Sequence, residues 1–363
     1  MMLTEADGKA LLAEAGIAIP AGVECAAAEP PPLPFPGPWI AKAQLPAGGR
    51  GKAGLIRRCG GEAELRAALP ALLGAAHRGH RAETCLIEPA ISGAEHYLAV
   101  MLDPASYRLR LLHSPDGGTD IETTGATTDL LFDPDTADAA LAGLPAPVAA
   151  AARALIGLVV SRELLLAEIN PLFVTATAAI AADAKLVLDL NALPRQPRLA
   201  ALIAARPAVY PDALRKLEAG FDYVELDVEG AIGLLTTGAG LSMMLIDELT
   251  ASGARPLNFC DIRTSMLRGS PARIIAALGW MAARPSLRVV LVNIFAGITD
   301  LGEFAALLAD ALAASPGLRV PVVARLIGRG QDAAARILAE RAPAVTLEAD
   351  LDRALDRVVA LAA

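Results

Sequence analysis

Two oxygen-bearing side chains lie at equal distances on either side of a short polar segment of the sequence. Asn170 and Asp183 flank residues 175–178, whose centre is also the midpoint between them. If the flanking segments pair as an antiparallel hairpin, the two side chains stand opposite or nearly opposite each other. Mg²⁺ prefers such hard oxygen ligands, few from the protein and the rest from phosphates and water. The spacing predicts a metal site, and a hairpin whose polar residues only face solvent is the alternative.

A second candidate site combines glycines with positive charge. Lys42 ends a short apolar segment, and the glycine-rich segment 47–54, Ala-Gly-Gly-Arg-Gly-Lys-Ala-Gly, follows it closely. Glycines let backbone N–H groups approach an anion, and Lys and Arg supply the charge that phosphate oxygens require. The segment matches neither the P-loop nor the dinucleotide fingerprint. It predicts a cover for phosphate groups, and an exposed turn with a solvated arginine is the alternative.

The first 200 residues, in which these candidates lie, mix helical and strand patterns irregularly. In chain order we predict a helix over 5–16, a loop over 30–38, strands over 39–42, 85–88 and 97–101, and a helix over 147–166. Glu168, two residues before Asn170, lies on the same face of its strand by alternation and adds negative charge to the metal site.

From Ala231 onward the pattern becomes regular. Strands are predicted at 232–235, 257–259, 289–294 and 322–324, each followed by a turn and a helix. Four successive βα units predict a parallel, doubly wound sheet, in which ligands bind at the carboxyl ends of the strands. The loops to consider are therefore 236–240, 261–270, 296–300 and 327–330. We predict an α/β protein with an α+β domain over 1–205 and a doubly wound domain over 226–363.

Bulk composition excludes several classes of protein. The 363 residues carry a net charge of −8, which argues against binding to a nucleic-acid backbone. No stretch approaches the roughly 20 uninterrupted apolar residues that span a bilayer, and the N-terminus does not resemble a signal peptide. The four cysteines are too far apart for zinc or redox motifs, so we interpret them as buried free thiols. We expect a cytoplasmic protein with no nucleic-acid or membrane partner.

Several motifs resemble the succinyl-CoA synthetase β subunit and its malate–CoA ligase relatives. They are Ala-Glu-Ile-Asn-Pro-Leu at 167–172, Asp-Ala-Lys at 183–185, Asn-Ala-Leu-Pro-Arg-Gln-Pro at 191–197, residues 39–44 and 48–54, Gly117-Gly118 with Ile121-Glu122, and the segments 236–241 and 292–298. The likeness covers nearly the whole chain. It implies an ATP-grasp domain followed by a flavodoxin-like CoA-ligase domain, and the activity of an ADP-forming acid–thiol ligase.

The resemblance also assigns roles in the first domain. Residues that contact nucleotide are implied to be Lys42, Gly49, Arg50 and Gly51, with Glu88 and Glu95 holding the base and ribose. Asn170 and Asp183 match Mg²⁺ ligands, and Glu168 matches a carboxylate that meets the partner's catalytic histidine. Arg50 and Glu168 are the implied catalytic residues. From the residues alone, Glu88 and Glu95 would be interpreted as solvated strand ends.

The second domain departs from the family at its loops. The resemblance implies that the residues contacting the acyl substrate are Thr237, Gly238, Gly297, Ile298 and Thr299. Thr237 replaces an asparagine of the succinate-type enzymes, and both Thr299 and the segment 326–330 are further departures. We therefore expect a small, dicarboxylate-like acid other than succinate.

A further departure lies in the loop that the family uses near the phosphohistidine. Its Gly-Gly-Gly-Ala stretch is replaced here by residues 262–266, and Ser270 is predicted to cap the next helix. Arg263, Thr264 and Ser265 form a possible phosphate loop through charge and hydroxyl donors. The alternative is that the loop has decayed or serves another partner.

The expected protein is thus the β subunit of an acid–CoA ligase. It would use ATP or GTP with Mg²⁺, while an α subunit supplies the phosphorylated histidine and most of the CoA site, because none of the four histidines has the family's phosphohistidine setting. Two alternatives remain open from the sequence. One is a self-contained ATP-grasp carboxylate–amine ligase, and the other is a non-catalytic nucleotide-binding subunit.

Overall fold

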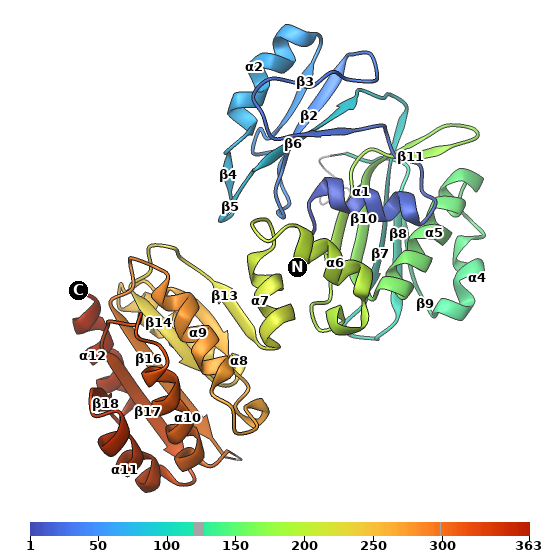
Figure 1. Ribbon diagram of the computed structural model, residues 1–363. Coiled ribbons are helices and arrows are strands. Elements are labelled where there is room, and N and C mark those ends of the chain that lie inside the picture. The colour runs from blue at the N-terminus through green and yellow to red at the C-terminus, as the bar shows by residue number, and fades with distance from the viewer. Residues whose placement is uncertain (119–126, 298) are drawn as a thin grey trace. The chain divides into compact units, whose positions relative to one another are not determined.

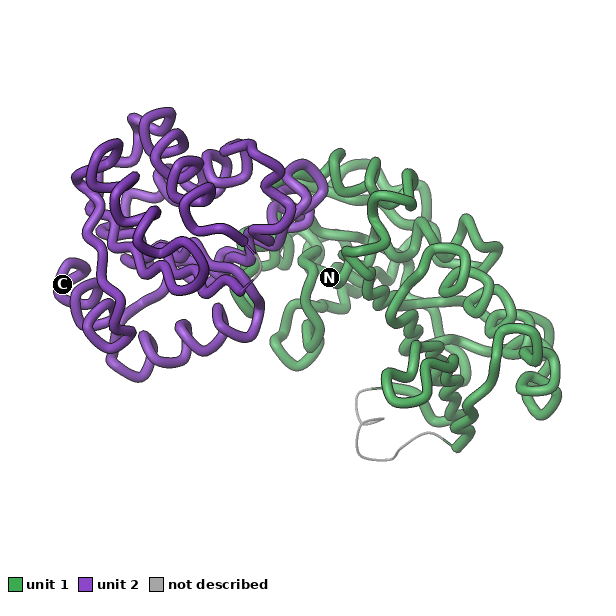
Figure 2. The backbone as a smooth tube through the Cα atoms, turned by 90° about the horizontal axis from the view of Figure 1, so that it is seen from below, with its two compact units in different colours: residues 1–209 green, residues 210–363 purple. Residues whose placement is uncertain are grey.

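The computed structural model describes residues 1–118, 127–297 and 299–363. Ile121, Glu122 and Ile298, which the sequence analysis singled out, lie outside the described residues. The chain forms two compact units, the N-terminal unit of residues 1–209 and the C-terminal unit of residues 210–363 (Figure 2). The predicted domain limits 1–205 and 226–363 remain a prediction. Residues 210–225 belong by their contacts to the C-terminal unit.

The first sheet of the N-terminal unit is antiparallel and carries Lys42 and Glu88. Its strands, in spatial order, are β1 (Val23–Cys25), β6 (Thr84–Pro89), β2 (Trp39–Gln44) and β3 (Ile56–Cys59). Helix α2 (Glu62–Leu72) packs on β2 and β3, and its Leu65, Leu69 and Leu72 are buried at helical spacing. Beside this sheet lies the short hairpin of β4 (Ala76–His77) and β5 (His80–Arg81).

The second sheet of this unit carries the predicted metal ligands. Its antiparallel strands are β7 (Ala94–Leu102), β8 (Leu109–Ser114), β9 (Thr128–Phe132), β10 (Leu164–Val174), β11 (Ala179–Ala181) and β12 (Lys185–Leu188). The order is β11-β10-β7-β8-β9, and β12 also pairs with β10. The other helices among the described residues of this unit are α1 (Glu5–Glu14), α4 (Ala137–Leu141), α5 (Ala146–Arg162) and α6 (Pro197–Ala205), with 3₁₀ turns at Pro134–Thr136 and Leu193–Arg195. Helix α5 packs against β7 and β10 (Figure 1).

The predicted hairpin is confirmed, whereas one predicted helix is too long. β10 and β11 pair antiparallel, and Thr175 N–H donates to the carbonyl of Ala178 across the turn. The helix predicted over 147–166 instead ends at Arg162, because Glu163 adopts a left-handed conformation with φ 53°. Residues 164–166 are the first residues of β10, so their leucines belong to a strand rather than to the helix.

The C-terminal unit contains the predicted βα units. Its elements are α7 (Pro211–Ala219), β13 (Asp222–Glu225), β14 (Ile232–Thr236), α8 (Ala239–Ala251), β15 (Asn258–Asp261), a 3₁₀ turn at Thr264–Met266, α9 (Ala272–Ala282), β16 (Val289–Ala296), α10 (Leu301–Ala313), β17 (Val322–Gly328), α11 (Gln331–Arg341), β18 (Val345–Leu347) and α12 (Leu351–Ala362). Strands β14 to β18 are parallel in the order β15-β14-β16-β17-β18. Numbered from β14, that is the flavodoxin-like order 2-1-3-4-5.

Helices cover both faces of this parallel sheet, so the predicted doubly wound arrangement is confirmed. α8 and α12 share one apolar cluster with the sheet, and α9, α10 and α11 share the other (Figure 1). β13 adds an antiparallel strand beside β15, and its Tyr223 is buried in the second cluster. The order of the strands reverses between β14 and β16, which places the candidate ligand loops at the carboxyl ends of these strands.

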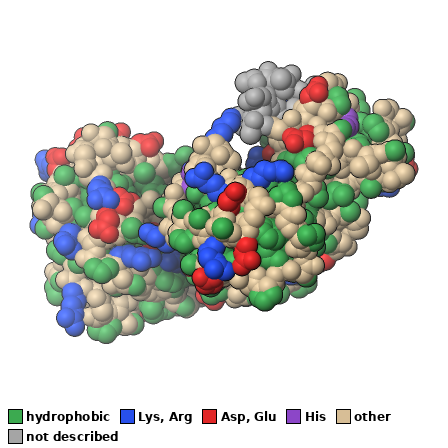
Figure 3. Space-filling view, turned by 90° about the horizontal axis from the view of Figure 1, so that it is seen from above, with side chains coloured by type: hydrophobic (Ala, Val, Ile, Leu, Met, Phe, Trp, Pro, Cys, Tyr) green, Lys and Arg blue, Asp and Glu red, His purple; other side chains and the backbone are tan. Residues whose placement is uncertain are grey.

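The surface is mixed in charge, as the composition predicts. On the face shown in Figure 3, acidic and basic side chains are interspersed among apolar and neutral ones. Within the described ranges, none of the helices combines the length and the apolar character needed to cross a membrane.

Leu291 on β16 tests the core of the C-terminal unit. It is fully buried in the middle of the sheet, so Leu291→Ala should lower the unfolding free energy of this unit by about 2–5 kcal/mol. The control is Leu347→Ala on β18. This leucine is 39% exposed, so its substitution should lower the unfolding free energy clearly less. Denaturant unfolding followed by Trp280 fluorescence in a Trp39→Phe background measures both, and equal losses would contradict the assigned core.

Candidate functional site

Helix α1 lies between the two sheets of the N-terminal unit and connects them. Leu3 N–H donates to the carbonyl of Leu186 on β12, and Ala6 N–H donates to the Gln44 side chain on β2. The helix approaches the segment between β11 and β12 closely, because a Cβ at Gly8 would lie 3.2 Å from Cβ of Ala184. One side of α1 therefore faces the predicted nucleotide and metal residues.

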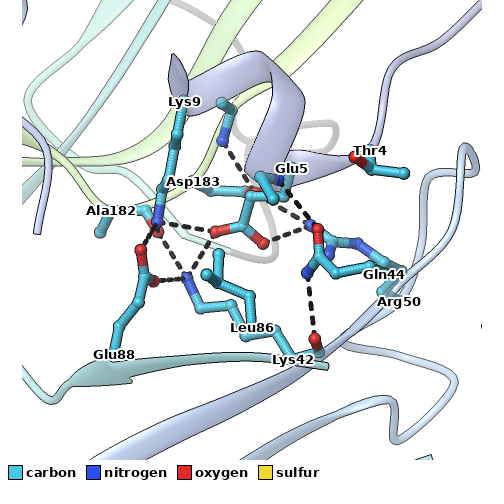
Figure 4. Close-up of polar contacts among 12 residues, drawn as sticks. Thr4, Glu5, Lys9, Lys42, Gln44, Arg50, Leu86, Glu88, Ala182 and Asp183 are labelled. Carbon is cyan, nitrogen blue, oxygen red and sulfur yellow. Dashed lines mark hydrogen bonds and ion pairs between the residues drawn. The ribbon is translucent and has the colours of Figure 1, made fainter. Parts of the chain in front are cut away.

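This side of α1 brings a charged pair into the interior. Glu5 and Lys9 are one helical turn apart, with 2.8 Å between Lys9 Nζ and Glu5 Oε1, and both are buried. Glu5 Oε1 also accepts from Lys42 Nζ at 2.6 Å, and Glu5 Oε2 accepts from Arg50 at 2.7 Å. One carboxylate thus joins α1, strand β2 and the glycine-rich segment (Figure 4).

The cluster extends to Glu88 and Asp183. Glu88 on β6 forms ion pairs with both lysines: its Oε1 lies 2.5 Å from Lys9 Nζ, and its Oε2 lies 2.8 Å from Lys42 Nζ. Arg50 reaches Asp183 Oδ1 at 3.0 Å, and it also donates to the carbonyl of Ala43 at 3.2 Å. Three cations and three carboxylates therefore meet in one charge-balanced group, which we call the charge cluster: Glu5, Lys9, Lys42, Arg50, Glu88 and Asp183.

Ion pairing keeps Glu5 ionised despite its burial. Burial alone would raise the pKa of the Glu5 carboxyl, but Lys42, Lys9 and Arg50 hold it well below its usual value. The pKa of Lys42 is raised, since burial lowers it less than Glu5, Glu88 and Asp183 raise it. The pKa of Lys9 is lowered, because burial and the adjacent Lys42 outweigh its two carboxylate partners.

The structure thus brings together four of the residues predicted from sequence: Lys42, Arg50, Glu88 and Asp183. It corrects the interpretation of Glu88 as a solvated strand end, because Glu88 is 2% exposed and paired with two lysines. Sequence reasoning missed Glu5 and Lys9. Their only signal is a spacing of four in the first helix, which is equally typical of a solvent-exposed ion pair.

The glycine-rich segment has two positions that demand glycine and one that does not. Gly49 and Gly54 have φ +79° and φ +71°, conformations that L side chains rarely adopt. Gly51 has open space around it, with nothing within 4 Å of an added Cβ. His77 Nε2 lies 2.9 Å from the carbonyl of Gly48 and ties the β4–β5 hairpin to the segment. The segment is held in place while its Gly51 face stays free.

The predicted metal ligands occupy matching positions of the hairpin. Leu172 pairs with Ala181 and Glu168 with Lys185, a register that sets Asn170 opposite Asp183 between them. Asn170 exchanges two hydrogen bonds with the backbone of Gly118, accepting N–H at 2.7 Å and donating to the carbonyl at 2.8 Å. Its amide oxygen keeps a second lone pair for a cation.

Both donors are of the type that Mg²⁺ prefers. Among the described residues, no three His, Cys, Asp or Glu side chains are grouped so as to hold a metal. An ion at Asn170 and Asp183 would therefore take most of its ligands from phosphate and water, as Mg²⁺ commonly does.

Glu168 and Glu95 lie outside the charge cluster. Glu168 on β10 forms an ion pair with Lys185 at 3.0 Å, and it accepts from Tyr97, whose pKa is raised by burial and by this carboxylate. Glu95 is exposed at the start of β7, and its backbone carbonyl accepts from Gly117 N–H at 2.7 Å. Gly117 cannot be replaced there without a shift, because an added Cβ would lie 2.6 Å from the backbone of His96.

In the C-terminal unit, three of the predicted loops are joined by hydrogen bonds. Gly238 N–H donates to Asp261 at 2.9 Å, and Thr264 N–H donates to Thr237 Oγ1 at 3.5 Å. Thr299 donates to Thr264 Oγ1 at 2.9 Å. The predicted substrate residues Thr237, Gly238 and Thr299 therefore lie at one end of the parallel sheet, and Gly297 is exposed beside them.

The loop 262–270 differs from its prediction in the pairing of Arg263. Arg263, with φ 53°, donates to Asp222 at 2.6 Å, so its charge is already paired. Pro271 already has helical backbone angles at the start of α9. The Ser270 hydroxyl accepts from Ala272 N–H at 3.3 Å, so the predicted cap by Ser270 is confirmed. Ser265 is exposed.

Comparison with known proteins finds matches along the whole chain. The ATP-grasp domain family matches residues 2–130, and the CoA-ligase family matches residues 235–359. The β subunit of succinate–CoA ligase (ADP-forming) from Chloroflexus aurantiacus is 35% identical over 384 residues, covering 98% of each chain. The β subunit of the same name from Thioalkalivibrio sulfidiphilus is 35% identical over 394 residues, covering 99% of each.

A solved structure shares the arrangement at lower sequence identity. ATP citrate lyase from Methanothrix soehngenii, in complex with citrate and coenzyme A, superposes with a TM-score of 0.64 at 18% identity, covering 89% of this chain and 87% of that one. At that identity the likeness concerns the fold alone.

The charge on Glu5 predicts a specific dependence of stability on pH. Since its folded-state pKa is lowered, its contribution to stability is present above the ordinary value of 4.5 and is lost as the pH falls through the folded-state pKa. Glu5→Gln should cost roughly 3–5 kcal/mol at pH 7. The difference from the natural chain should shrink towards acid pH.

Denaturant unfolding from pH 7 to pH 3, followed by Trp39 fluorescence in a Trp280→Phe background, measures this difference. The control is Glu62→Gln on the exposed side of α2, which should stay within about 0.5 kcal/mol of the natural chain. A Glu5→Gln difference that is small at pH 7, or that grows on acidification, would contradict the ionised buried carboxylate.

Proposed function

Because the chain belongs to the family of ADP-forming succinate–CoA ligase β subunits, we propose that it uses Mg-ATP to phosphorylate a histidine of a partner α subunit. The phosphohistidine then activates a small carboxylic acid for thioester formation with CoA. Family membership makes the chain a subunit of an acid–thiol ligase that uses nucleotide and Mg²⁺. The phosphorylated residue, the CoA site on the partner and the identity of the acid are the parts we propose.

The observation that carries the proposal is the charge cluster. Lys42 and Arg50 present two buried cations to one site, and Asp183, the predicted Mg²⁺ ligand, lies 3.0 Å from Arg50. Phosphoryl transfer needs little covalent help from a protein, so positioning and charge stabilisation supply most of the catalysis. Two cations beside a hard oxygen ligand are the groups that this chemistry requires.

Each group has a role in the proposed transfer. Lys42 and Arg50 would bind the phosphate oxygens and stabilise the charge that spreads over the γ-phosphoryl group as its bond to the β-phosphate breaks. Asn170 and Asp183 would hold Mg²⁺, which would further neutralise the phosphate charge when bound. The exposed backbone at Gly51 leaves room for the nucleotide to approach. Glu88 and Glu95 remain the proposed contacts of the base and ribose.

We propose that the phosphoryl group is accepted by a histidine of another chain, because none of the four histidines of this chain has the family's phosphohistidine setting. His96 and His113 are buried against each other at 3.1 Å, and His77 is bound to the carbonyl of Gly48. Glu168 on β10, held by Lys185 and Tyr97, is proposed to meet the partner's histidine, because its side chain is only partly buried. After transfer, the phosphohistidine would give its phosphoryl group to the carboxylic acid, and the CoA thiol would displace phosphate from the acyl phosphate.

The acid is proposed to be small and dicarboxylate-like, but not succinate. Thr237 stands where succinate-type enzymes carry asparagine, and Thr264 and Thr299 connect two loops through their hydroxyl groups. Hydroxyl donors in place of an amide change which substrate oxygens can be bound. This loop set is the proposed binding site for the acyl group in the C-terminal unit.

Co-expression with the product of the neighbouring gene tests the proposal. ADP release should require Mg-ATP, CoA, the partner and one acid from a panel of dicarboxylates and sulfonated acids.

Asp183→Ala should lower turnover by about 10²-fold or more, because it removes a charged ligand that acts in the transition state. Full Mg-ATP-dependent activity of Asp183→Ala would refute the metal site. ADP release with an amine and no partner would instead identify a self-contained ligase, and nucleotide binding without turnover a non-catalytic subunit.

Gly51→Ala tests where the nucleotide lies without disturbing the fold. Nothing lies within 4 Å of an added Cβ, so the melting temperature should not change. If the nucleotide phosphates approach this backbone, the methyl group should weaken ATP binding by roughly tenfold, as steric exclusion from a close contact does. Titration calorimetry with Mg-ATP measures it, with Gly143→Ala, another open position, as control. Unchanged affinity would place the nucleotide elsewhere.

A further inference from the structure

Lys9 and Lys42 bind the same three acceptors, although they come from different elements. Lys42 Nζ contacts Glu5 at 2.6 Å, Glu88 at 2.8 Å and the carbonyl of Ala182 at 2.6 Å. Lys9 Nζ contacts Glu5 at 2.8 Å, Glu88 at 2.5 Å and the same carbonyl at 2.9 Å. An ammonium group has three donors, so each lysine is fully engaged (Figure 4).

Only one of these lysines is placed to act on phosphate in the proposed function. Lys42 lies on β2, which leads into the glycine-rich segment, and its side chain is 9% exposed against 3% for Lys9. To bind a phosphate group, its ammonium must leave Glu5 and Glu88, at least in part. Two buried carboxylates would then lose a partner, and an uncompensated buried charge is strongly unfavourable.

Lys9 removes this difficulty. It stays on Glu5 and Glu88 through contacts that do not involve Lys42, while Arg50 holds the other oxygen of Glu5 at 2.7 Å. When Lys42 moves, Lys9 remains paired with both Glu5 and Glu88. The side chain of Lys9 is only 3% exposed, so its charge is stabilised by the two carboxylates and not by solvent.

We propose that Lys9, together with Glu5, is a positioning pair that holds Lys42 before nucleotide binds and frees it for the nucleotide phosphates. Lys9 is the permanent counter-ion of the two glutamates, and Lys42 is the exchangeable one. Lys9 itself does not touch the nucleotide. This inference rests on the proposed function, because it assumes that Lys42 meets ATP.

Loss of the Lys9 charge should therefore trap Lys42 on the glutamates. In the full chain with its partner, Lys9→Met should raise the Kd and the KM for Mg-ATP by roughly tenfold or more, because Lys42 becomes the only lysine on two buried carboxylates. Turnover at saturating ATP should stay within about threefold of the natural chain, since the transfer step is unaltered. Lys9→Arg should keep normal ATP binding.

Charge balance distinguishes this role from a purely structural one. In Lys9→Met/Glu5→Gln, one carboxylate is removed along with its cation, so ATP binding should recover part of the loss. A structural role predicts that the double variant is the worst of all. Lys9→Gln, which keeps hydrogen-bond donors but no charge, should show the same tenfold loss and serves if the methionine variant does not fold. Arg66→Gln, which removes an exposed helix ion pair on α2, is the control and should bind ATP normally.

Titration calorimetry with Mg-ATP, circular dichroism and steady-state kinetics decide the outcome. A raised Kd with partial recovery in the double variant supports the proposal. An unchanged Kd in Lys9→Gln and Lys9→Met, or a loss of turnover without a change in Kd, overturns it. If the natural chain with its partner does not bind Mg-ATP at all, the proposed function fails instead.

Discussion

The carboxylate of Glu5 is the interaction on which the nucleotide half of this protein depends. A buried carboxylate is costly unless it is paired, and here three cations from three segments surround it within 2.8 Å. It fixes α1 to strand β2 and to the glycine-rich segment, and it holds Arg50 beside Asp183. The approach of α1 is close, because a Cβ at position 8 would lie 3.2 Å from Cβ of Ala184. Fold and site are therefore built by the same contacts.

Most of the fold could be predicted from the sequence, because the hydrophobic period of helices and strands and the pairing register of a hairpin produce clear sequence patterns. The alternation of strands and helices after Ala231 predicted the parallel sheet, and the symmetry of 170 and 183 about a polar turn predicted the hairpin. Both are confirmed, as is the order of an ATP-grasp domain followed by a CoA-ligase domain. The helix end at Arg162 was missed, because leucines at 164–166 fit either a helix or a buried strand.

The charge cluster was only half predictable, for a physical reason. Arg50 lies between two glycines and Lys42 a few residues before them, a combination that marks an anion site in sequence. Glu5 and Lys9 stand in an ordinary helix, where a spacing of four says nothing about which side is buried. Their role follows from the packing of α1 onto segment 182–184, a tertiary contact. The same limit applies to Arg263, whose pairing with Asp222 joins residues 41 positions apart.

The central claim is that this chain passes a phosphoryl group from ATP to a histidine of another chain. The most direct measurement incubates the chain and its partner with Mg²⁺ and ATP labelled at the γ-phosphate, without acid or CoA, and separates the two polypeptides. We expect label on the partner alone, labile to acid and stable to base as phosphohistidine is, and absent with Asp183→Ala. Label that never reaches the partner, while ADP still forms, would contradict the account.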